Sequence, residues 1–352
     1  MPTDLLELTK RLIQIPSICG HEDEIAEFIA SKLKGSVEMQ HVEGAGPNVL
    51  ARGWSERAGL LLCGHMDTVP PTQGCERDPF TPLVVHDRLH GLGAADMKAG
   101  LACAIALYNE HVDALPIAFL ATADEEGQCR GVFRYLEDDP RHDLCIVLEP
   151  TGAKALLGAR GRYVLEIVVH GRAAHGARPE EGINAIEEAG RVIERLRGLK
   201  PRRHRLLGEG SKCILKIEGG GDSLTVPGEC MIRLDRHVVP GESKEDVWKE
   251  VQQCLSGAGL RYALRWMPRP TPFLEAYITS KSALVKRFLT LSGAEEGYAA
   301  SVGDYNALGA RMPTLIYGPK GGGWHTDEEH VEIHSIQLTA EVMRGFLRTL
   351  RL

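Results

Sequence analysis

Five side chains of the kinds that bind metal ions are spread along this chain. Four of them stand where an apolar, strand-like run ends, and the fifth stands in a stretch rich in glycine and alanine; in chain order they are His65, Asp96, Glu126, Glu149 and His325. A site for two metal ions needs such an odd number, because each ion takes two side chains of its own and one carboxylate is shared. Reactive groups collect at the carboxyl ends of the strands in an open α/β sheet, so these residues predict one dinuclear site.

The first two of these residues each have a structural alternative. In a strand, side chains two residues apart point to the same face, so Asp67 is expected to accept a hydrogen bond from one ring nitrogen of His65 while the other nitrogen binds metal. A plain polar contact would use the same pair. Asp96, as a bridging carboxylate, would hold two ions roughly 3.5–4 Å apart. It could also cap a helix that starts near Met97, and the two roles are compatible.

Three adjacent acids, Asp124, Glu125 and Glu126, directly follow an apolar run. Neighbouring carboxylates repel one another unless cations are present, although a solvated turn would carry the same residues. Beside the other candidate ligands, the metal interpretation is favoured. Adjacent side chains point in different directions, so one glutamate can bind metal while the other serves as general base. Glu149 closes an apolar run and needs a partner if it is buried, either a metal ion or an arginine.

All five candidate ligands offer oxygen or imidazole nitrogen, and none offers a thiolate. This ligand set predicts two Zn²⁺ ions per chain, with Co²⁺ or Mn²⁺ fitting nearly as well. Two such ions lower the pKa of a water molecule between them and polarise a carbonyl group, which suits hydrolysis of an amide. The glycine-rich segment before His325 is not a phosphate loop, because neither GK[ST] nor a helix start follows it.

Three residues in the later part of the chain are candidates for contact with a substrate. His175 stands just beyond a predicted strand, and a structural role and a functional role are equally compatible with a single histidine there. Arg236 could clamp a substrate carboxylate with its planar guanidinium, or it could form a salt bridge with Asp235 or Glu242. Arg178 is a weaker candidate of the same kind.

The elements that must position these residues fall into two groups. Apolar runs alternate with helical stretches from residue 48 to 150, which predicts a mostly parallel sheet with helices on its faces. The order then changes to strand, helix, strand, strand, helix, strand, with expected bounds of 163–169, 183–196, 213–217, 230–238, 244–255 and 262–266. This βαββαβ order is the ferredoxin-like unit. We therefore expect a catalytic α/β domain over 1–159 and 268–352, interrupted by a ferredoxin-like domain over 160–267.

Composition narrows the class of protein. A chain of 352 residues suggests two domains, and 43% hydrophobic with 25% charged residues is ordinary for a globular protein. A net charge of −7 argues against a nucleic-acid partner. Nine cysteines, an odd number without a CxxC pair, argue against a disulfide framework and for a reducing compartment. With no signal peptide and no apolar run long enough to span a membrane, a cytoplasmic protein without a membrane partner is expected.

Seven segments of the chain resemble one family in order. They are GHMDTVP, GLGAADMKAG, TADEEG, LEPTG, AHGARPEEGINAI, DRHVVPGE and WHTDEEH. Together they are similar to the dinuclear zinc amidohydrolase and carboxypeptidase family, which includes acetylornithine deacetylase, succinyl-diaminopimelate desuccinylase, aminoacylase and glutamate carboxypeptidase. The resemblance covers nearly the whole chain. It implies a catalytic domain with an inserted ferredoxin-like lid through which many members form homodimers.

The resemblance also implies roles for individual residues. His65, Asp96 and Glu149 would hold one zinc ion, and the other would be held by Asp96, Glu126 and His325. Further implied roles are general base for Glu125, orienter of His65 for Asp67, oxyanion stabiliser for His175 and carboxylate contact for Arg236. In dimeric members the residue matching His175 reaches the site of the partner subunit.

These observations predict a metallohydrolase that cleaves the amide bond of an N-acyl amino acid, as acetylornithine deacetylase and succinyl-diaminopimelate desuccinylase do in amino-acid biosynthesis. A dipeptidase or carboxypeptidase with the same two-zinc chemistry is the alternative. A catalytically silent metal-binding homologue is disfavoured, because Glu125 and all five candidate ligands are present. A thiol-based enzyme is set aside, because no cysteine stands beside an activating histidine in a recognisable motif.

Overall fold

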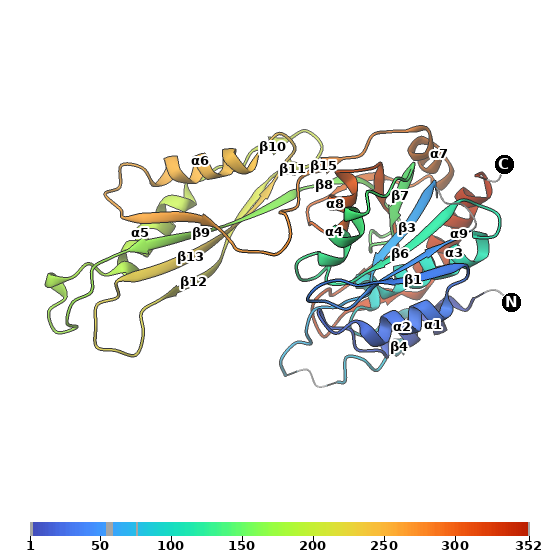
Figure 1. The fold of residues 1–352 in the computed structure, drawn as a ribbon, viewed down its shortest axis with the longest axis horizontal. Helices are drawn as coiled ribbons and strands as arrows, with labels where there is room; N and C mark the ends of the chain where they lie inside the picture. The colour runs from blue at the N-terminus through green and yellow to red at the C-terminus, as the bar shows by residue number, and fades with distance from the viewer. Residues whose placement is uncertain (1–2, 54–58, 75–76, 351–352) are drawn as a thin grey trace. The chain divides into compact units, whose positions relative to one another are not determined.

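The computed structural model describes residues 3–53, 59–74 and 77–350, and its chain divides into two compact units (Figure 1). Unit 1 comprises Met1–Gly158, Ile278–Ala299 and Gly303–Leu352, and unit 2 comprises Ala159–Tyr277 and Ala300–Val302. The expected second boundary was 267/268, ten residues earlier than this division. Residues 268–277 group with unit 2, where Leu274 forms a backbone bridge to Arg162 and the ring of Phe273 packs edge-on against Trp266.

Unit 1 is built on a nine-stranded sheet. Its strand order is β1 (Ser36–Gln40), β2 (Asn48–Arg52), β6 (Ile117–Thr122), β3 (Leu60–His65), β7 (Leu144–Val147), β17 (Thr314–Ile316), β8 (Ala155–Ala159) and β15 (Tyr277–Ile278), with β16 (Glu296–Ala299) paired to β8. The four central strands β6, β3, β7 and β17 run parallel. The prediction of a largely parallel central sheet is confirmed. Because parallel strands point the same way, their carboxyl ends share one edge, where the site lies.

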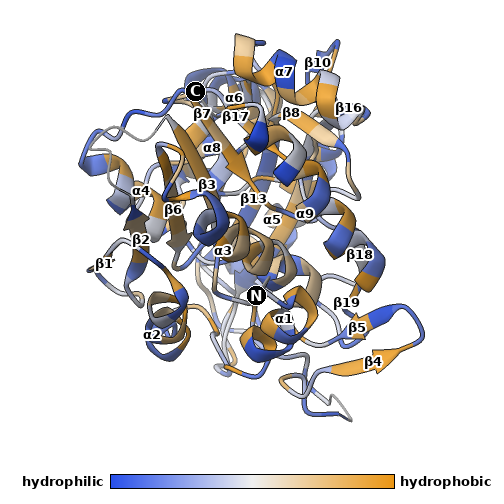
Figure 2. Ribbon diagram, turned by 90° about the vertical axis from the view of Figure 1, so that its right-hand side faces the viewer, coloured by the Kyte–Doolittle hydropathy of each residue, from blue (hydrophilic) through white to orange (hydrophobic). Residues whose placement is uncertain are grey.

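Helices cover the sheet of unit 1. They are α1 (Leu5–Ile13), α2 (Asp23–Lys32), α3 (Ala99–His111), α4 (Arg130–Glu137), α7 (Ala283–Ser292), α8 (Asp304–Gly309) and α9 (Ile333–Arg348). Asp4 caps α1 as expected, since its carboxylate accepts hydrogen bonds from the amides of Leu6 and Glu7. Helix α3 is apolar on nearly every side and lies between the sheet and helices α1 and α9 (Figure 2). An all-round apolar helix of this kind must be buried, and α3 forms the centre of the largest core cluster.

A smaller antiparallel sheet in unit 1 joins two distant parts of the chain. Its strand order is β18 (Gly321–Gly322), β19 (His330–Glu332), β5 (Arg88–His90) and β4 (Leu83–Val85). His325 lies in the loop between β18 and β19, and Asp96 follows β5 by six residues. Pairing of β19 with β5 therefore brings these two candidate ligands to the same place.

Unit 2 has the expected ferredoxin-like order. The elements are β9 (Gly161–His170), α5 (Ala185–Arg197), β12 (Ser211–Gly219), β13 (Glu229–Val238), α6 (Lys244–Leu255) and β14 (Tyr262–Trp266), with a 3-10 turn (Pro179–Glu181) and a short hairpin of β10 (Arg203–His204) and β11 (Gly208–Glu209). The four long strands form an antiparallel sheet in the order β12-β13-β9-β14. Helices α5 and α6 pack on one face through Val192 and Val251, which contact the core cluster of Ile167 and Ile232.

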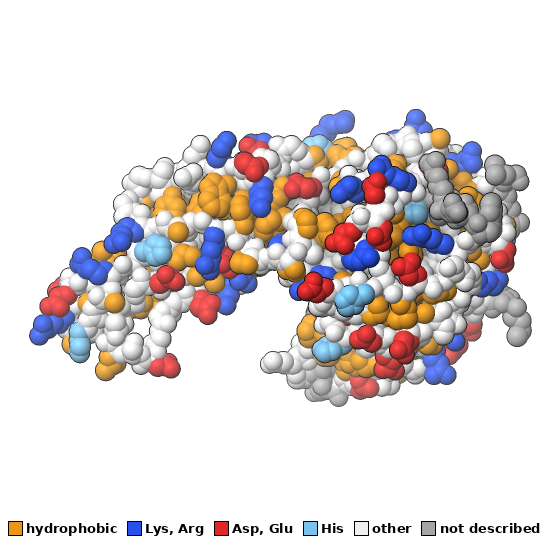
Figure 3. All heavy atoms as spheres, viewed as in Figure 1, with side chains coloured by type: hydrophobic (Ala, Val, Ile, Leu, Met, Phe, Trp, Pro, Cys, Tyr) orange, Lys and Arg blue, Asp and Glu red, His pale blue; other side chains and the backbone are white. Residues whose placement is uncertain are grey.

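On the face of the molecule in Figure 3, acidic, basic and hydrophobic side chains are interspersed, with the charged groups on the outside as in other globular proteins. In the part of the chain that the structure describes, no helix combines the length and apolar character needed to cross a bilayer.

Candidate metal centre

Three neighbouring parallel strands deliver most of the predicted ligands. His65 is the last residue of β3, Glu149 follows β7 by two residues, and Glu126 lies in the turn after β6. The side chain of His65 is almost fully enclosed, whereas those of Glu126 and Glu149 keep a small exposed area. The ends of these strands meet because β3 pairs with both β6 and β7 in parallel register.

One group of three candidate ligands gathers around His65. Its Nε2 atom lies 3.1 Å from Oδ1 of Asp96 and 3.8 Å from Oε1 of Glu149. One ligand atom from each of the three residues lies within 4.8 Å of the other two. This is the spacing of side chains that can turn toward one cation.

The second group shares Asp96 with the first. Nε2 of His325 lies 2.9 Å from Oε1 of Glu126 and 3.5 Å from Oδ2 of Asp96. The two oxygens of Asp96 therefore face different histidines, as a carboxylate between two metal ions must. The predicted ligands thus meet in two triads with one common member.

Burial and crowded carboxylates shift the pKa values of several groups at this site. Contacts with Asp96 and Glu126 raise the pKa of His325 to about 10. Burial raises the pKa values of Glu125 and Glu149 well above the ordinary glutamate value, and nearby carboxylates add to the rise. Carboxylates that lie close together hold protons more tightly, and a bound cation would replace those protons.

Asp67 lies against Nδ1 of His65 with both its backbone carbonyl and its carboxylate. Nδ1 of His65 lies 3.0 Å from the backbone carbonyl oxygen of Asp67 and 3.5 Å from its carboxylate. Strand β3 ends at His65, so the alternation of a strand does not extend to Asp67. The carboxylate of Asp67 also accepts hydrogen bonds from the amides of Glu125 and Glu126, at 3.1 and 3.0 Å, and from the thiol of Cys19 at 3.1 Å.

Glu125 stands beside both triads. One of its carboxylate oxygens lies within 4.8 Å of ligand atoms of His65 and Glu126. A β-carbon added to Gly303 would lie 2.4 Å from Oε1 of Glu125, so the backbone of Gly303 closely backs this carboxylate. Glu125 is therefore half-buried, placed next to the candidate metal ligands, and confined in position.

Glu329, which was not among the predicted site residues, lies against the segment that carries Asp96. This glutamate is 2% exposed. Its carboxylate accepts hydrogen bonds from the amides of Gly93, Ala95 and Asp96, at 2.9, 3.0 and 3.0 Å. It follows His325 by four residues, so it ties the His325 loop to the Asp96 segment. A buried carboxylate with three backbone donors is a positioning group.

Two more buried groups were missed in the same way. The carboxylate of Glu22 accepts hydrogen bonds from the amides of Gly46 and Asp124, at 2.7 and 3.1 Å, and so anchors the turn that carries Glu125. The ammonium of Lys98 is fully buried and donates to the carbonyl oxygen of Ile15 at 2.9 Å. Burial lowers the pKa of Lys98 to about 7. Only the acidic or basic nature of these residues is visible in the sequence.

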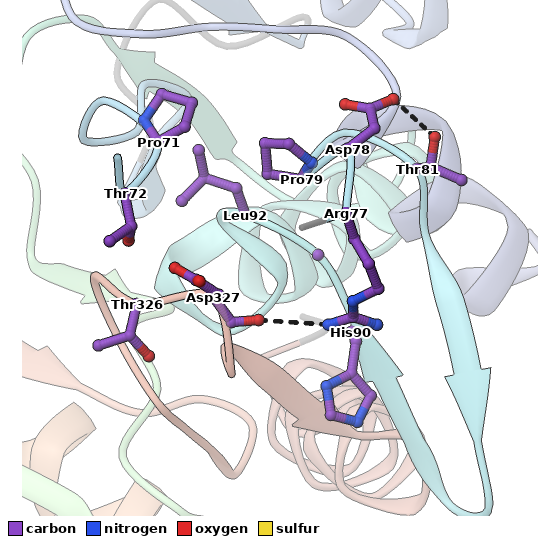
Figure 4. Close-up of a pocket in the computed structure, with 11 residues that line it drawn as sticks. Pro71, Thr72, Arg77, Asp78, Pro79, Thr81, His90, Leu92, Thr326 and Asp327 are labelled. Atoms are coloured by element: carbon purple, nitrogen blue, oxygen red, sulfur yellow. Dashed lines mark hydrogen bonds between the residues drawn. The ribbon is translucent and has the colours of Figure 1, made fainter. Parts of the chain in front are cut away.

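The loop that carries His325 also forms a wall of a small pocket (Figure 4). Thr326 and Asp327 face His90 and Arg77 across it, and Nη2 of Arg77 donates to the carbonyl oxygen of Asp327 at 3.3 Å. This hydrogen bond attaches the loop to Arg77 two residues after His325.

The three predicted substrate contacts all lie in unit 2. His175 is exposed, and its Nδ1 accepts a hydrogen bond from the amide of Ala177 at 3.1 Å. Arg178 is exposed and pairs with Glu181 at 3.4 Å. Arg236 is 0% exposed, and its guanidinium contacts Glu250 at 2.5 Å and Glu242 at 3.4 Å. These contacts correspond to the salt-bridge alternative for Arg236, whose side chain has no exposed surface to offer a substrate.

The chain is similar to known proteins over nearly its whole length. The model of peptidase family M20/M25/M40 matches residues 61–349. The chain is 30% identical to the acetylornithine deacetylase of Proteus mirabilis, over 97% of this chain and 95% of that protein. It is 29% identical to the succinyl-diaminopimelate desuccinylase of Cupriavidus necator, over 99% of each.

Solved structures show the same fold. An M20 family metallo-carboxypeptidase from Sulfolobus solfataricus superposes with a TM-score of 0.78 at 18% identity, over 99% of each chain. The matched family model spans all five predicted ligands and most of both units. The chain therefore belongs to peptidase family M20/M25/M40 and is a hydrolase that acts on amide bonds.

Proposed function

We propose that this chain hydrolyses the amide bond of an N-acyl amino acid, in the manner of acetylornithine deacetylase and succinyl-diaminopimelate desuccinylase. The proposal rests on the position of Asp96 between two histidines. Its two oxygens lie 3.1 Å from His65 and 3.5 Å from His325, and the carboxylate of Glu125 lies near the same group of side chains. The nearly full-length similarity to two amino-acid deacylases supports the substrate class.

The residues present fit two divalent cations. His65, Asp96 and Glu149 would hold one ion, and Asp96, Glu126 and His325 would hold the other. Oxygen and imidazole ligands favour Zn²⁺, with Co²⁺ or Mn²⁺ as substitutes. When bound, the ions would supply a water molecule of lowered pKa and polarise the acyl carbonyl group.

The remaining steps fall to side chains of the chain itself. Glu125 would take a proton from the attacking water and return it to the leaving amine, because its carboxylate is next to both triads. The carboxylate of Asp67 accepts hydrogen bonds from the amides of Glu125 and Glu126, and it would thereby fix the backbone of both the base and a ligand. His175 would donate to the oxyanion, in its own subunit or that of a partner.

We also propose a homodimer formed through unit 2. Strand β12 lies at one edge of the sheet, and Leu215 and Ile217 on it are each 50% exposed. An exposed apolar edge strand is a ready site for pairing with a second copy. The oligomeric state measured by light scattering tests this, with a monomer at all concentrations as the contrary result.

A dipeptidase or carboxypeptidase is the second candidate, favoured by the likeness in fold to a metallo-carboxypeptidase. The deciding experiment is a hydrolysis screen of metal-free protein reloaded with Zn²⁺ or Co²⁺. The panel holds N-acetylornithine, N-acetylcitrulline, N-succinyl-diaminopimelate, other N-acyl amino acids and simple dipeptides. Release of amine from an acyl amino acid supports the proposal, and cleavage of dipeptides alone supports the second candidate. No turnover with both metal ions bound would indicate a silent homologue.

A further inference from the structure

A third cluster of ligand atoms lies behind the proposed base, on the side formed by the turn after β6 and the start of α8. It consists of Glu125, Cys129 and Asp304. One carboxylate oxygen from each acid and the thiol sulfur of Cys129 all lie within 4.8 Å of one another. Cys129 is 4% exposed and Asp304 is 2% exposed.

Asp304 is the unusual member of this cluster. Both of its carboxylate oxygens are buried, and among the described residues neither has a hydrogen-bond partner of good geometry. Burial raises the pKa of Asp304 to about 7, more than the neighbouring Thr122 and Cys129 lower it. The nearest donors, Thr122 and Cys129, are poorly placed for a hydrogen bond to this carboxylate. An enclosed carboxylate in such a position is costly, so it must hold either a proton or a cation.

Nearby buried carboxylates do not share this condition. Asp124 accepts hydrogen bonds from the amides of Gln128 and Arg130 and from the guanidinium of Arg130. Glu22 and Asp67 each accept several hydrogen bonds from backbone amides or a thiol. These three carboxylates therefore have hydrogen-bond donors, whereas Asp304 lies beside a thiol and a second carboxylate.

We propose that Glu125, Cys129 and Asp304 form a third cation site, distinct from the two triads, that takes a thiophilic divalent ion such as Zn²⁺ or Cd²⁺. One sulfur and two oxygens, with a water in the fourth position, make a tetrahedral set that suits these ions and not Mg²⁺ or Ca²⁺. On binding, the Cys129 thiol loses its proton to solvent, and its thiolate becomes the ligand.

The consequence for catalysis rests on the proposed function. Glu125 cannot accept a proton from water while its carboxylate is bound to a cation. A filled third site would therefore inhibit hydrolysis, and it would fill only after the two triads are occupied, because its thiol must first lose a proton. The site makes the enzyme sensitive to an excess of the same metal that activates it.

The test uses enzyme that already holds two equivalents of Zn²⁺ and adds Cd²⁺ as the probe. Neither triad contains sulfur, so an ultraviolet thiolate-to-cadmium charge-transfer absorption reports on a cysteine site alone. We expect this absorption to saturate at one further equivalent and to be lost in Cys129→Ser and in Asp304→Asn. Cys19→Ser is the matched control, since this thiol contacts Asp67 at 3.1 Å, and it should keep the absorption.

Inhibition provides the second measurement. Each enzyme is titrated with excess Zn²⁺. The half-inhibitory concentration is the Zn²⁺ concentration that halves that enzyme's own uninhibited rate. Cys129→Ser should raise this concentration at least about tenfold, because serine is a much poorer zinc ligand than a thiolate. Equal inhibition of both enzymes, or no charge-transfer absorption at a third equivalent of Cd²⁺, would overturn the proposal. The absorption needs no turnover, so a failure of the proposed function leaves this test intact.

Discussion

The carboxylate of Glu329 accepts a hydrogen bond of 3.0 Å from the backbone amide of Asp96, a residue 233 positions earlier in the chain. Asp96 belongs to both metal triads, and His325 belongs to one of them. Because Glu329 follows His325 by four residues, a single buried carboxylate fixes the backbone on both sides of the second triad.

Glu329→Gln tests this positioning role. Glutamine keeps one carbonyl oxygen, but its NH₂ group would face one of the three backbone N–H donors now bound by the carboxylate. We expect the affinity for metal to fall by about 10–100-fold, the usual cost of losing a partner behind the ligands. Equilibrium titration with Zn²⁺ measures the change. Glu328→Gln is the matched control, because the side chain of Glu328 is exposed. Equal metal affinity in the two variants would refute the role.

Glu125 and Glu126 are adjacent, yet we expect opposite outcomes for them. Glu125→Gln should lower kcat by at least about 100-fold while both metal ions stay bound, because a general base is removed and no ligand is lost. Glu126→Gln should lose metal, since this carboxylate contacts His325 at 2.9 Å in the second triad. Metal analysis after gel filtration, beside the rate, separates the two. If Glu125→Gln lost metal, Glu125 would be a ligand and the assigned roles would be wrong.

The central sheet could be predicted from sequence, and so could the edge where most of the candidate ligands gather, because both depend on local patterns. Each apolar run became a strand, and three runs that end near His65, Glu126 and Glu149 lie side by side in parallel. An acid or a histidine after such a run therefore falls on the shared edge. His325 departs from this pattern, because it lies in the loop between β18 and β19 and the pairing of β19 with β5 places it beside Asp96.

The supporting groups could not be predicted, because their roles depend on contacts between distant segments. Glu328 and Glu329 are identical in type and adjacent, and only the packing of β19 on β5 decides which one is buried. Asp304 had no signal at all, since its surroundings come from the turn after β6. Because β3 stops at His65, Nδ1 of His65 lies nearer to the backbone oxygen of Asp67, at 3.0 Å, than to its carboxylate, at 3.5 Å.

Arg236 offers a test between a structural and a substrate-binding role. Its guanidinium is enclosed with Glu242 and also contacts the partly exposed Glu250, so Arg236→Leu would leave the buried carboxylate of Glu242 without its cation. Breaking a buried ion pair costs about 3–5 kcal/mol of unfolding free energy. Denaturant unfolding should show a loss of this size, and Arg178→Leu, at an exposed pair, should show little. A raised KM with unchanged stability in Arg236→Leu would instead restore its role as a carboxylate contact.

Gly303→Ala should disturb the base without touching a ligand. The added β-carbon would lie 2.4 Å from Oε1 of Glu125 and 2.7 Å from the ring of Tyr305, so the glutamate must move. A displacement of about 1 Å at a reacting group can cost about 100-fold in rate, so we expect a fall in kcat of that order with both metal ions retained. Gly345→Ala is the control, because nothing lies within 4 Å of its added β-carbon in helix α9. Wild-type kcat in Gly303→Ala would show that the base tolerates the shift.

The raised pKa of His325 gives the metal-free protein a defined pH dependence. Asp96 and Glu126 raise it to about 10 from the ordinary histidine value of about 6.5, so the folded chain holds this proton more tightly than the unfolded chain. The resulting stability is fully present below about pH 6.5 and is lost as the pH rises toward 10. Metal-free wild type should therefore exceed His325→Gln in Tm at pH 7, and the difference should shrink by pH 10. Thermal unfolding of both proteins across this range is the measurement, and a difference that grows with pH would contradict the assigned contacts.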